Sequence, residues 1–366
     1  MSTVLGIMSG TSIDGVDYAL CDISERCVKL RQHWHVAFPK RLRQRLQLAA
    51  ANRSTTYDLG RLHHELGRFY ARGARRLKNA QPVACVGLHG QTVFHDANAR
   101  ATLQIGEPAW LAAELRVPVV NNFRPSDIVA GGQGAPLATI FHEWVFAERG
   151  RHVCVNNLGG ISNVTSLDGR GGNQPRIKAF DTGPANMLMD MAVARLTRGR
   201  QTFDVNGRWA KRGTPRDELL AKWLKHPFFK QKPPKSTGRE LFGEIFLERV
   251  FRQAKGLSRF DLLATLTEFT ARSIALNYSL HLPDTPERVV LCGGGASNPV
   301  FVEAIRRNVP CQVISCESLG WPAQAIEPAA FALLAWLRMN GLPGNVPSTT
   351  GAKSSVTLGQ ITQLRR

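Results

Sequence analysis

Val4-Leu-Gly-Ile-Met8, Ser9-Gly-Thr-Ser-Ile-Asp-Gly15 and Val16-Asp-Tyr-Ala-Leu-Cys-Asp-Ile23 open the chain. The first and third pieces are apolar runs typical of β-strands, and the middle piece is a turn of small residues. We therefore predict that the fold opens with a hairpin around a glycine turn.

The opening pattern returns near the middle of the chain. Val153-Cys-Val-Asn156 and Ile161-Ser-Asn-Val-Thr-Ser-Leu167 are again apolar runs, and Asn157-Leu-Gly-Gly160 lies between them. Two strand-turn-strand units so far apart in one chain indicate a duplicated architecture. We expect two like domains that face each other across a cleft.

Three further segments have clear local signals. Apolar residues recur every three or four positions over 57–77, which predicts a helix with one buried face. Arg288-Val-Val-Leu-Cys292 predicts a buried strand that enters the turn Gly293-Gly-Gly295, after which Ser297 or Asn298 opens a helix. Segment 231–239 is rich in Pro and small polar residues and is expected to be a loop.

Composition limits the class of protein. The 366 residues suffice for two domains, and no apolar run approaches the ~20 residues of a membrane-spanning helix. The N-terminus lacks the pattern of a secretion signal, so we expect a cytoplasmic protein without a membrane partner. Seven scattered cysteines without a Cys-x-x-Cys pair are expected to be reduced thiols.

The chain is strongly basic. Lys plus Arg number 47 against 28 Asp plus Glu, a formal charge of +19, which would attract phosphates, nucleic acid or anionic membranes. The charge is spread along the chain, and its densest stretch, 40–46, reads as the outer face of a helix with Leu42 and Leu46 turned inward. We favour a basic solvated surface and no nucleic-acid partner, with nucleic-acid binding kept as a competing hypothesis.

The first glycine turn is a candidate phosphate site. Its small side chains, hydroxyls and backbone N–H groups can surround a phosphate closely, although an ordinary hairpin turn explains the same residues. The turn has no lysine and leads into a strand, so neither the Walker loop nor the dinucleotide fingerprint applies. Asp14 strengthens the functional interpretation, because a carboxylate beside phosphates can hold Mg2+ or its waters.

Asp181 is the candidate general base. It lies in Phe180-Asp-Thr-Gly-Pro-Ala-Asn186 at the end of a predicted strand and before a predicted helix, whose N-terminus would favour the ionised carboxylate. A plain helix-capping aspartate is the alternative. An aspartic peptidase would need a second such aspartate, and the chain has no second Asp-Thr-Gly.

Two histidines and an ion pair complete the candidates. His89 and His95 are six residues apart, which fits sugar contacts or structural histidines better than a metal site. Arg124 and Asp127 precede a glycine-rich segment and could pair at a hinge, or lie in a simple turn.

Nine colinear motifs between residues 4 and 361 resemble the anhydro-N-acetylmuramic acid kinase family. They are 8–17 (MSGTSIDGVD), 89–93 (HGQTV), 131–137 (GGQGAPL), 157–163 (NLGGISN), 180–186 (FDTGPAN), 235–240 (KSTGRE), 292–295 (CGGG), 342–348 (LPGNVPS) and 350–352 (TGA). Their common order makes the resemblance far more specific than any one glycine turn.

The resemblance implies an α/β fold of two actin-like, ribonuclease-H-like domains, with mixed sheets flanked by helices and ATP in the interdomain cleft. The expected division is 1–127, completed by about 345–366, and 128–344. The implied reaction opens the 1,6-anhydro ring of 1,6-anhydro-N-acetylmuramic acid with water and phosphorylates O6 from ATP, which gives N-acetylmuramic acid 6-phosphate and ADP in peptidoglycan recycling. ATP and Mg2+ are the implied cofactors, and a homodimer is one of the oligomeric states left open.

The resemblance also implies roles for particular residues. Asp181 would activate the water, and Glu327 would help to orient the sugar. ATP and its phosphates would contact Gly10, Thr11, Ser12, Ile13, Asp14, Gly15, Val16, Asp17, Asn157, Gly159, Gly160, Gly293, Gly294 and Gly295, with Asp14 as the Mg2+ residue. The sugar would contact His89, Gly90, Thr92 and Asn186.

The chain departs from the family pattern at Asn122, where Asp is usual, and at Gln324-Ala325, a stretch that is often acidic. These departures bear on the sugar contacts and the hinge and leave Asp181 untouched. An actin-like ATP-dependent binding or chaperone module is the alternative function, and it would show slow ATP turnover that a partner protein stimulates.

Overall fold

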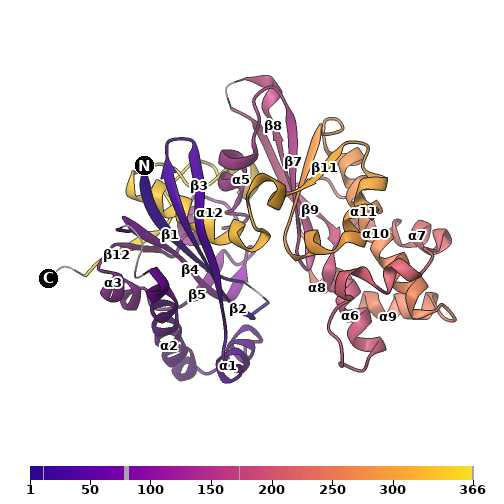
Figure 1. The fold of residues 1–366 in the computed structure, drawn as a ribbon, viewed down its shortest axis with the longest axis horizontal. Coiled ribbons are helices and arrows are strands. Elements are labelled where there is room, and N and C mark those ends of the chain that lie inside the picture. Colours follow the sequence, from indigo (N-terminus) through magenta and orange to yellow (C-terminus); the bar gives the residue numbers. More distant parts are fainter. Residues whose placement is uncertain (11, 78–81, 173, 365–366) are drawn as a thin grey trace. The chain divides into compact units, whose positions relative to one another are not determined.

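The computed structural model describes residues 1–10, 12–77, 82–172 and 174–364. The chain divides into two compact units, Met1–Val145 with Gln324–Arg366 and Phe146–Ala323, here the first and the second unit. Each unit is an α/β structure built on its own mixed sheet (Figure 1).

The first unit contains a sheet of seven strands. Its strands are β1 (Ser2–Ser9), β2 (Gly15–Ser24), β3 (Cys27–Ala37), β4 (Cys85–Asp96), β5 (Ala101–Ile105), β6 (Val119–Asn121) and β12 (Gln360–Thr362). Its helices are α1 (Lys40–Ala50), α2 (Thr56–Ala74), α3 (Ala109–Leu115), α4 (Arg124–Val129), α5 (Thr139–Phe146), α12 (Ile326–Met339) and α13 (Pro347–Thr350), with the short 3-10 turn η1 (Arg75–Leu77).

The second unit contains a sheet of five strands. They are β7 (His152–Leu158), β8 (Ile161–Asp168), β9 (Arg176–Pro184), β10 (Arg288–Cys292) and β11 (Gln312–Ser315). Its helices are α6 (Asn186–Leu196), α7 (Asp217–Trp223), α8 (Arg239–Phe242), α9 (Glu244–Gln253), α10 (Arg259–His281) and α11 (Pro299–Asn308), with 3-10 turns that include η5 (Pro227–Lys230), η6 (Gly294–Ser297) and η7 (Cys316–Leu319).

The two sheets share one topology. In the first unit β1, β2 and β3 form an antiparallel meander, while β4 runs parallel to β1 and β6 parallel to β4. In the second unit β7, β8 and β9 form the meander, while β10 runs parallel to β7 and β11 parallel to β10. The order β3-β2-β1-β4-β6 thus repeats as β9-β8-β7-β10-β11, which is the ribonuclease-H-type arrangement and confirms the predicted duplication.

Strand alternation sorts the helices of the first unit between the two faces of its sheet. Leu5 and Ile7 of β1 join a buried core with residues of α1 and α2, including the predicted inward residues Leu42 and Leu46. Gly6 points to the opposite face, where a β-carbon would collide with the backbone of Pro328 in α12. This close approach holds the first turn of α12 against the sheet.

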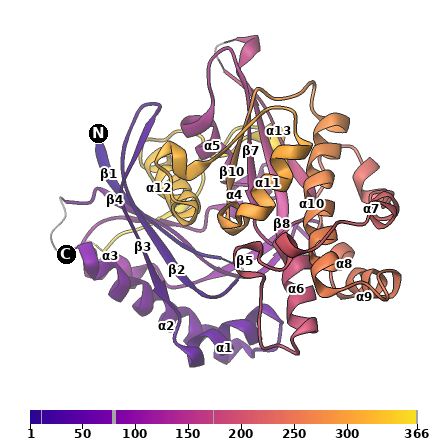
Figure 2. The ribbon, with the colours of Figure 1, turned by 45° about the vertical axis from the view of Figure 1, so that its right-hand side comes forward.

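The core of the second unit is built from helices on its sheet. Apolar residues of β7, β8, β10, α6, α9, α10 and α11 form one buried cluster. Figure 2 shows α10 and α11 side by side, and the two helices are in contact. The helix that the sequence predicts after the third glycine element is α11, and the Asn298 side chain caps it by accepting from the N–H groups of Val300 and Phe301.

The observed units differ from the expected division in two segments. Residues 128–145 and 324–344 were expected in the second domain, but both belong to the first unit. The reason for the later segment is the packing of α12 on β1, β2 and β4, which Gly6 and Gly87 permit because they have no side chain there. Local sequence patterns carry no information on that partner.

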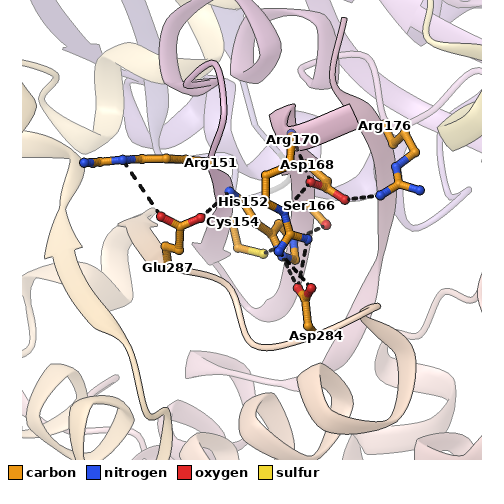
Figure 3. A network of polar contacts seen from close by, with 9 residues as sticks. All are labelled: Arg151, His152, Cys154, Ser166, Asp168, Arg170, Arg176, Asp284 and Glu287. Carbon is orange, nitrogen blue, oxygen red and sulfur yellow. Dashed lines mark hydrogen bonds and ion pairs between the residues drawn. The ribbon is translucent and has the colours of Figure 1, made fainter. Parts of the chain in front are cut away.

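A polar network braces one end of the sheet in the second unit (Figure 3). His152 is fully buried, and its Nδ1 lies 2.9 Å from the Asp284 carboxylate while its Nε2 lies 2.8 Å from the Ser166 hydroxyl. Asp284 also pairs with Arg170, which in turn pairs with Asp168. The order of groups is that of a Ser-His-Asp triad, but Ser166 is only 2% exposed, so the network is structural.

Two sequence expectations concern the whole chain. All seven cysteines are free thiols, as expected. Within the described ranges, no helix has both the length and the apolar character that crossing a membrane would take.

Candidate active site

The glycine turn between β1 and β2 is compact. The Ile13 N–H donates to the Gly10 carbonyl over 3.2 Å, and Ile13 adopts a left-handed φ of 52° while its side chain is buried in the core. A β-branched residue rarely adopts this conformation, so the turn is held by the packing of Ile13. Val16 is also buried, so only backbone groups of these two residues face away from the core. Thr11 lies outside the described residues.

Gly10 and Gly15 serve different purposes in this turn. A β-carbon on Gly15 would collide with the His35 ring and the Val36 carbonyl, so the fold itself requires glycine there. A β-carbon on Gly10 would meet only the Ser12 Oγ at 3.8 Å, so packing does not require glycine at that position. Space next to backbone amides is what a phosphate group needs.

Asp14 fits the predicted Mg2+ role. Its side chain is exposed, and its Oδ1 accepts a hydrogen bond from the Ser12 hydroxyl over 2.8 Å. Among the described residues no group of three or more His, Cys, Asp or Glu side chains could hold a metal. A single carboxylate suits Mg2+, which is commonly bound by one or two carboxylates together with substrate phosphates and waters.

Asp17 stands next to the turn on β2. Its Oδ1 lies 3.1 Å from the Nε2 of His33 and 3.1 Å from the Nδ1 of His35, both on the neighbouring strand β3. These contacts restrain the carboxylate that the sequence assigned to phosphate binding.

The predicted nucleotide residues of the second unit come together around α6. The carbonyls of Gly159 and Gly160, in the β7–β8 turn, accept from the first N–H groups of α6, and the Asn186 amide donates to the Leu158 carbonyl over 2.9 Å. Asn186, which was predicted to bind the sugar, therefore lies with the glycine turns and holds one of them.

The turn Gly293–Gly295 packs closely against this β7–β8 turn. Gly293 has a φ of 79°, and a β-carbon on it would collide with the Asn157 side chain. A β-carbon on Gly295 would lie 2.7 Å from the Leu158 β-carbon, whereas one on Gly294 would meet no atom within 4 Å. Gly293 and Gly295 are thus required by packing, and Gly294 borders open space.

Asp181 lies on β9 and is largely covered. Its backbone N–H donates to the Lys235 carbonyl over 3.1 Å, and its Oδ2 accepts from the Thr237 N–H over 2.8 Å. Burial raises the pKa of Asp181 to about 6, opposed mainly by the Thr237 hydrogen bond, while Glu240 adds to the rise and Lys235 opposes it.

Two interpretations of Asp181 change with this geometry. The helix after β9 begins at Asn186 and its first N–H groups bond to Gly159 and Gly160, so Asp181 caps no helix. The expectation that the helix end favours the ionised carboxylate is wrong, because burial dominates and raises the pKa. A pKa near 6 still leaves the carboxylate mostly ionised at neutral pH, which a general base requires.

Glu327 lies in the first turn of α12, as the sequence predicted. Its side chain keeps access to solvent, yet its pKa is raised, first by loss of hydration and second by the negative charge of Asp17. The positive charge of Arg124 acts in the opposite direction. Glu327, Asp17 and Arg124 therefore form one electrostatic group in the first unit.

His89 is a buried structural partner of Arg124. Its Nδ1 lies 2.8 Å from the Gly90 carbonyl, and its Nε2 lies 2.9 Å from a guanidinium nitrogen of Arg124. Burial first, and then the Arg124 charge, lowers the pKa of His89 far below its usual value, so the ring is neutral. His95 instead lies 3.1 Å from the Thr102 hydroxyl, so the two histidines do not share a metal site.

A pocket of about 200 Å³ lies beside His89 and Gly90 in the first unit. Polar side chains of Gln104, Asn121 and Asn122 contribute to its wall, and the buried Oε1 of Gln104 has no hydrogen-bond partner among the described residues. Thr92 is near its edge, since its hydroxyl accepts from the Gln104 amide over 3.3 Å. Asn122, one of the departures from the family pattern, adopts a φ of 53°, which Asn tolerates better than most residues.

Arg124 and Asp127 do not pair with each other. Arg124 donates to the Gly134 carbonyl over 2.7 Å, whereas Asp127 accepts from the Gly134 N–H over 2.8 Å. Asp127 is fully buried and also accepts from Asn345 and Thr350. The two residues hold the glycine-rich segment from both sides, and the hinge ion pair considered from sequence is wrong.

The sequence assigned no role to Lys235, Thr237 or Glu240, although all three lie in the quoted motif 235–240. The Lys235 carbonyl accepts from the Asp181 N–H, and the Thr237 N–H donates to the Asp181 carboxylate. The negative charge of Glu240 raises the pKa of Asp181. The only available signal was the motif itself, because 54 residues separate Asp181 from Lys235 (235 − 181).

Comparisons with known proteins identify relatives over the whole chain. A protein of Picosynechococcus named anhydro-N-acetylmuramic acid kinase is 40% identical over 373 residues, with 98% of each chain covered. One of Crocosphaera subtropica with the same name is 41% identical over 377 residues, again with 98% of each chain covered.

Solved structures show only remote likeness. A ROK family glucokinase from Streptomyces griseus, in complex with glucose and AMPPNP, is 16% identical with a TM-score of 0.41, over 91% of this chain and 99% of the other. Component A of the (R)-2-hydroxyglutaryl-CoA dehydratase from Acidaminococcus fermentans is 14% identical with a TM-score of 0.45, over 91% and 96%.

The family description "Anhydro-N-acetylmuramic acid kinase" matches residues 2–364. This match agrees with the nine motifs and with relatives at about 40% identity over nearly the full chain. The chain belongs to the anhydro-N-acetylmuramic acid kinase family.

Proposed function

We propose that this kinase opens the 1,6-anhydro ring of 1,6-anhydro-N-acetylmuramic acid with water and transfers the γ-phosphoryl group of ATP to O6. The products are N-acetylmuramic acid 6-phosphate and ADP, and the place of the reaction is peptidoglycan recycling. Family membership over residues 2–364 supports the proposal, and it does not favour an actin-like binding or chaperone module. We include a cytoplasmic location in the proposal, because the reaction consumes ATP.

The observation that carries the chemistry is the environment of Asp181. One carboxylate oxygen, Oδ2, is held by the Thr237 N–H, so Oδ1 is the oxygen left to accept a proton from water. The Thr237 hydroxyl is buried without a hydrogen-bond partner among the described residues, so it can hold that water by a hydrogen bond. A pKa near 6 makes Asp181 a stronger base than an ordinary aspartate while it stays ionised at neutral pH.

The proposed reaction moves one proton and two oxygen bonds. Asp181 takes a proton from water as the water oxygen bonds to the anomeric carbon C1. The bond from C1 to the bridging oxygen O6 breaks, and O6 bonds to the γ-phosphorus as the β,γ-bridging oxygen leaves with ADP. The water oxygen therefore ends at C1, and the former bridge oxygen carries the phosphoryl group.

We assign phosphate binding to the backbone of the β1–β2 turn and to the glycines that border open space. Gly10 and Gly294 leave room for a ligand without loss of packing, and Gly293 and Gly295 on either side of Gly294 pack against Asn157 and Leu158, which lead into the Gly159–Gly160 turn. Asp14 would hold Mg2+, which neutralises phosphate charge during transfer. Asn157 remains a proposed nucleotide contact, with its side chain against Gly293.

We assign the sugar to the pocket beside His89 and Gly90, with Glu327 as an orienting carboxylate. The amide groups of Gln104, Asn121 and Asn122 offer donors and acceptors for hydroxyl and N-acetyl groups. Arg124, held by His89 and Gly134, offers a positive charge that suits the lactyl carboxylate of a muramic acid.

The deciding experiment is an ATP-dependent conversion in water enriched in oxygen-18. Purified protein with MgATP should release ADP only with 1,6-anhydro-N-acetylmuramic acid, and neither glucose nor N-acetylmuramic acid should replace it. The label should appear on C1 of the sugar and not in the phosphate. ADP release without the anhydro-sugar, or label in the phosphate, would refute the proposal.

A further inference from the structure

Lys235 is buried, and among the described residues no carboxylate lies within hydrogen-bonding distance of its ammonium. The residue is only 9% exposed, and its ammonium donates to the carbonyls of Phe228 and Phe229 over 3.2 and 3.3 Å. It also lies 3.2 Å from the Nε2 of His281 and 4.6 Å from the centre of the Phe228 ring. Burying a charge in such surroundings is unfavourable, so a structural role alone would be served better by an apolar residue.

The backbone around Lys235 leads directly to Asp181. The Lys235 carbonyl accepts from the Asp181 N–H, and two residues later the Thr237 N–H donates to the Asp181 carboxylate. Segment 235–237 belongs to a loop, so these two hydrogen bonds need an anchor to keep their geometry. The ammonium in its cage of carbonyls and aromatic rings is that anchor.

Within the described part of the chain, the charges that act on Asp181 and Lys235 are those of Glu240 and of the pair itself. On Asp181, Glu240 of α8 acts to raise the pKa and Lys235 to lower it, after the larger effects of burial and the Thr237 N–H. Lys235 itself has a pKa lowered to about 8 by burial, which the charge of Asp181 opposes. On the α10 side, burial first and the Lys235 charge last lower the pKa of His281, so that neighbour adds no positive charge at neutral pH.

We propose that Lys235 is the positioning residue of the base: its ammonium anchors segment 235–237 across β9 and supplies a positive charge that acts on the Asp181 carboxylate. This inference rests on the proposed role of Asp181 in the reaction. It adds that the base works best while Lys235 is protonated, because the neutral amine neither holds its cage as firmly nor favours the carboxylate.

The test compares pH profiles of kcat/KM for the wild type, Lys235→Met and the control Lys232→Met, an exposed lysine in the same loop. Methionine fills the aromatic cage without charge, so we expect Lys235→Met to fold, which its melting curve checks. Loss of the Lys235 charge should raise the pKa of Asp181, so the midpoint of the acid limb should move to higher pH by roughly 0.5 unit. The kcat should fall ~10-fold, while KM for ATP changes less than twofold. Lys232→Met should match the wild type.

Lys235→Arg keeps a cation that does not titrate in the assay range. The wild type should lose activity above pH 8 as Lys235 deprotonates, and this alkaline limb should be absent in Lys235→Arg. An unmoved acid limb in folded Lys235→Met, or an alkaline limb that persists in Lys235→Arg, would overturn the proposal. Should Lys235→Met not fold, the Arg variant and the wild-type alkaline limb decide.

Failure of this inference is distinguishable from failure of the proposed function. If Asp181→Asn is inactive while the Lys235 variants keep the wild-type profile, Asp181 stays the base and Lys235 is only structural. If Asp181→Asn keeps full turnover, the base assignment falls and the Lys235 proposal falls with it.

Discussion

Three carboxylates with proposed roles have three different surroundings. Asp14 is exposed and bonded to Ser12, which suits a ligand of a hydrated cation. Asp181 is mostly covered, and burial raises its pKa to about 6, which suits a group that takes up a proton. Glu327 keeps access to solvent and has a pKa raised by loss of hydration and by Asp17. The same functional group thus gains different chemistry from burial and neighbouring charge.

Asp181→Asn should reduce turnover at least ~100-fold, because an amide keeps the shape but cannot take the proton. Nucleotide binding and melting temperature should not fall, since the variant removes a charge from a covered site. In the wild type, kcat/KM should be lost as pH falls through about 6, well above the ordinary value of 3.8, because only the ionised form is active. Steady-state kinetics from pH 5 to 8 measure both effects.

Asp190→Asn is the matched control for that profile. Burial raises the pKa of Asp190 to about 7, so it also titrates in the assay range, but it has no proposed role. The acid limb should persist in this variant. A limb that disappears with Asp190 and survives the loss of Asp181 would reassign the titration.

Glu327→Gln should act mainly on the sugar. The substitution removes the negative charge that Arg124 and Asp17 influence and leaves the shape of α12 intact. We expect KM for the anhydro-sugar to rise ~10-fold with a lower kcat, because a hydrogen bond from a charged group to a ligand contributes about 1.5–3 kcal/mol. KM for ATP should change little. Glu25→Gln, at an exposed turn, is the control, and equal sugar kinetics in both variants would exclude the role.

At the scale of elements, glycines decide how closely segments approach. Gly6 and Gly87 let the backbone of α12 lie directly on β1 and β4, and Gly293 and Gly295 let one turn of the second unit pack on another. Gly10 and Gly294 have no such packing reason. Glycines in one motif can therefore serve folding or leave room for a ligand, and only the contacts tell the two apart.

The pair Gly294→Ala and Gly295→Ala tests this distinction. In Gly295→Ala the new methyl would lie 2.7 Å from Leu158 and 2.9 Å from Asn186, so we expect a loss of about 1–3 kcal/mol in the free energy of unfolding. In Gly294→Ala the methyl meets no protein atom within 4 Å, so stability should stay within about 0.5 kcal/mol while ATP affinity falls. Denaturant unfolding and nucleotide titration check the pair, and unchanged ATP affinity in Gly294→Ala would remove this turn from the nucleotide site.

At the scale of the whole molecule, one topology occurs twice and the net charge is strongly positive. Each unit repeats the meander and the two parallel strands, and each has its own core and its own candidate residues. The charge of +19 suits substrates that carry phosphates and a carboxylate, but it is not needed for the chemistry of Asp181.

Binding to a 20-base-pair DNA duplex should therefore be weak and general. We expect a Kd of about 10⁻⁴ to 10⁻⁶ M at physiological salt, steeply weakened by added salt, with no preference among sequences. Kinase activity at 0.15 M salt should not change on addition of the duplex. Fluorescence anisotropy measures the binding, and nanomolar, sequence-selective affinity would support the nucleic-acid hypothesis instead.

The sequence by itself determined the elements and the family. Alternation in 4–23 and 153–167 predicted the two hairpins, spacing over 57–77 predicted α2, and colinear motifs predicted the family, because these signals are local or are read by order along the chain. The proposed roles of Asp181, Glu327 and the glycine turns also came from those motifs and stay predictions.

Only the tertiary structure decided which distant segments meet. It placed α12 on β1 and β4 of the first unit, set the neutral His89 against Arg124, and brought Lys235 and Thr237 to Asp181. Burial of Asp181 reversed the pKa direction expected from the helix that follows it. The physical reason is that desolvation and close packing depend on atoms that are neighbours in space, and a single sequence carries no direct record of them.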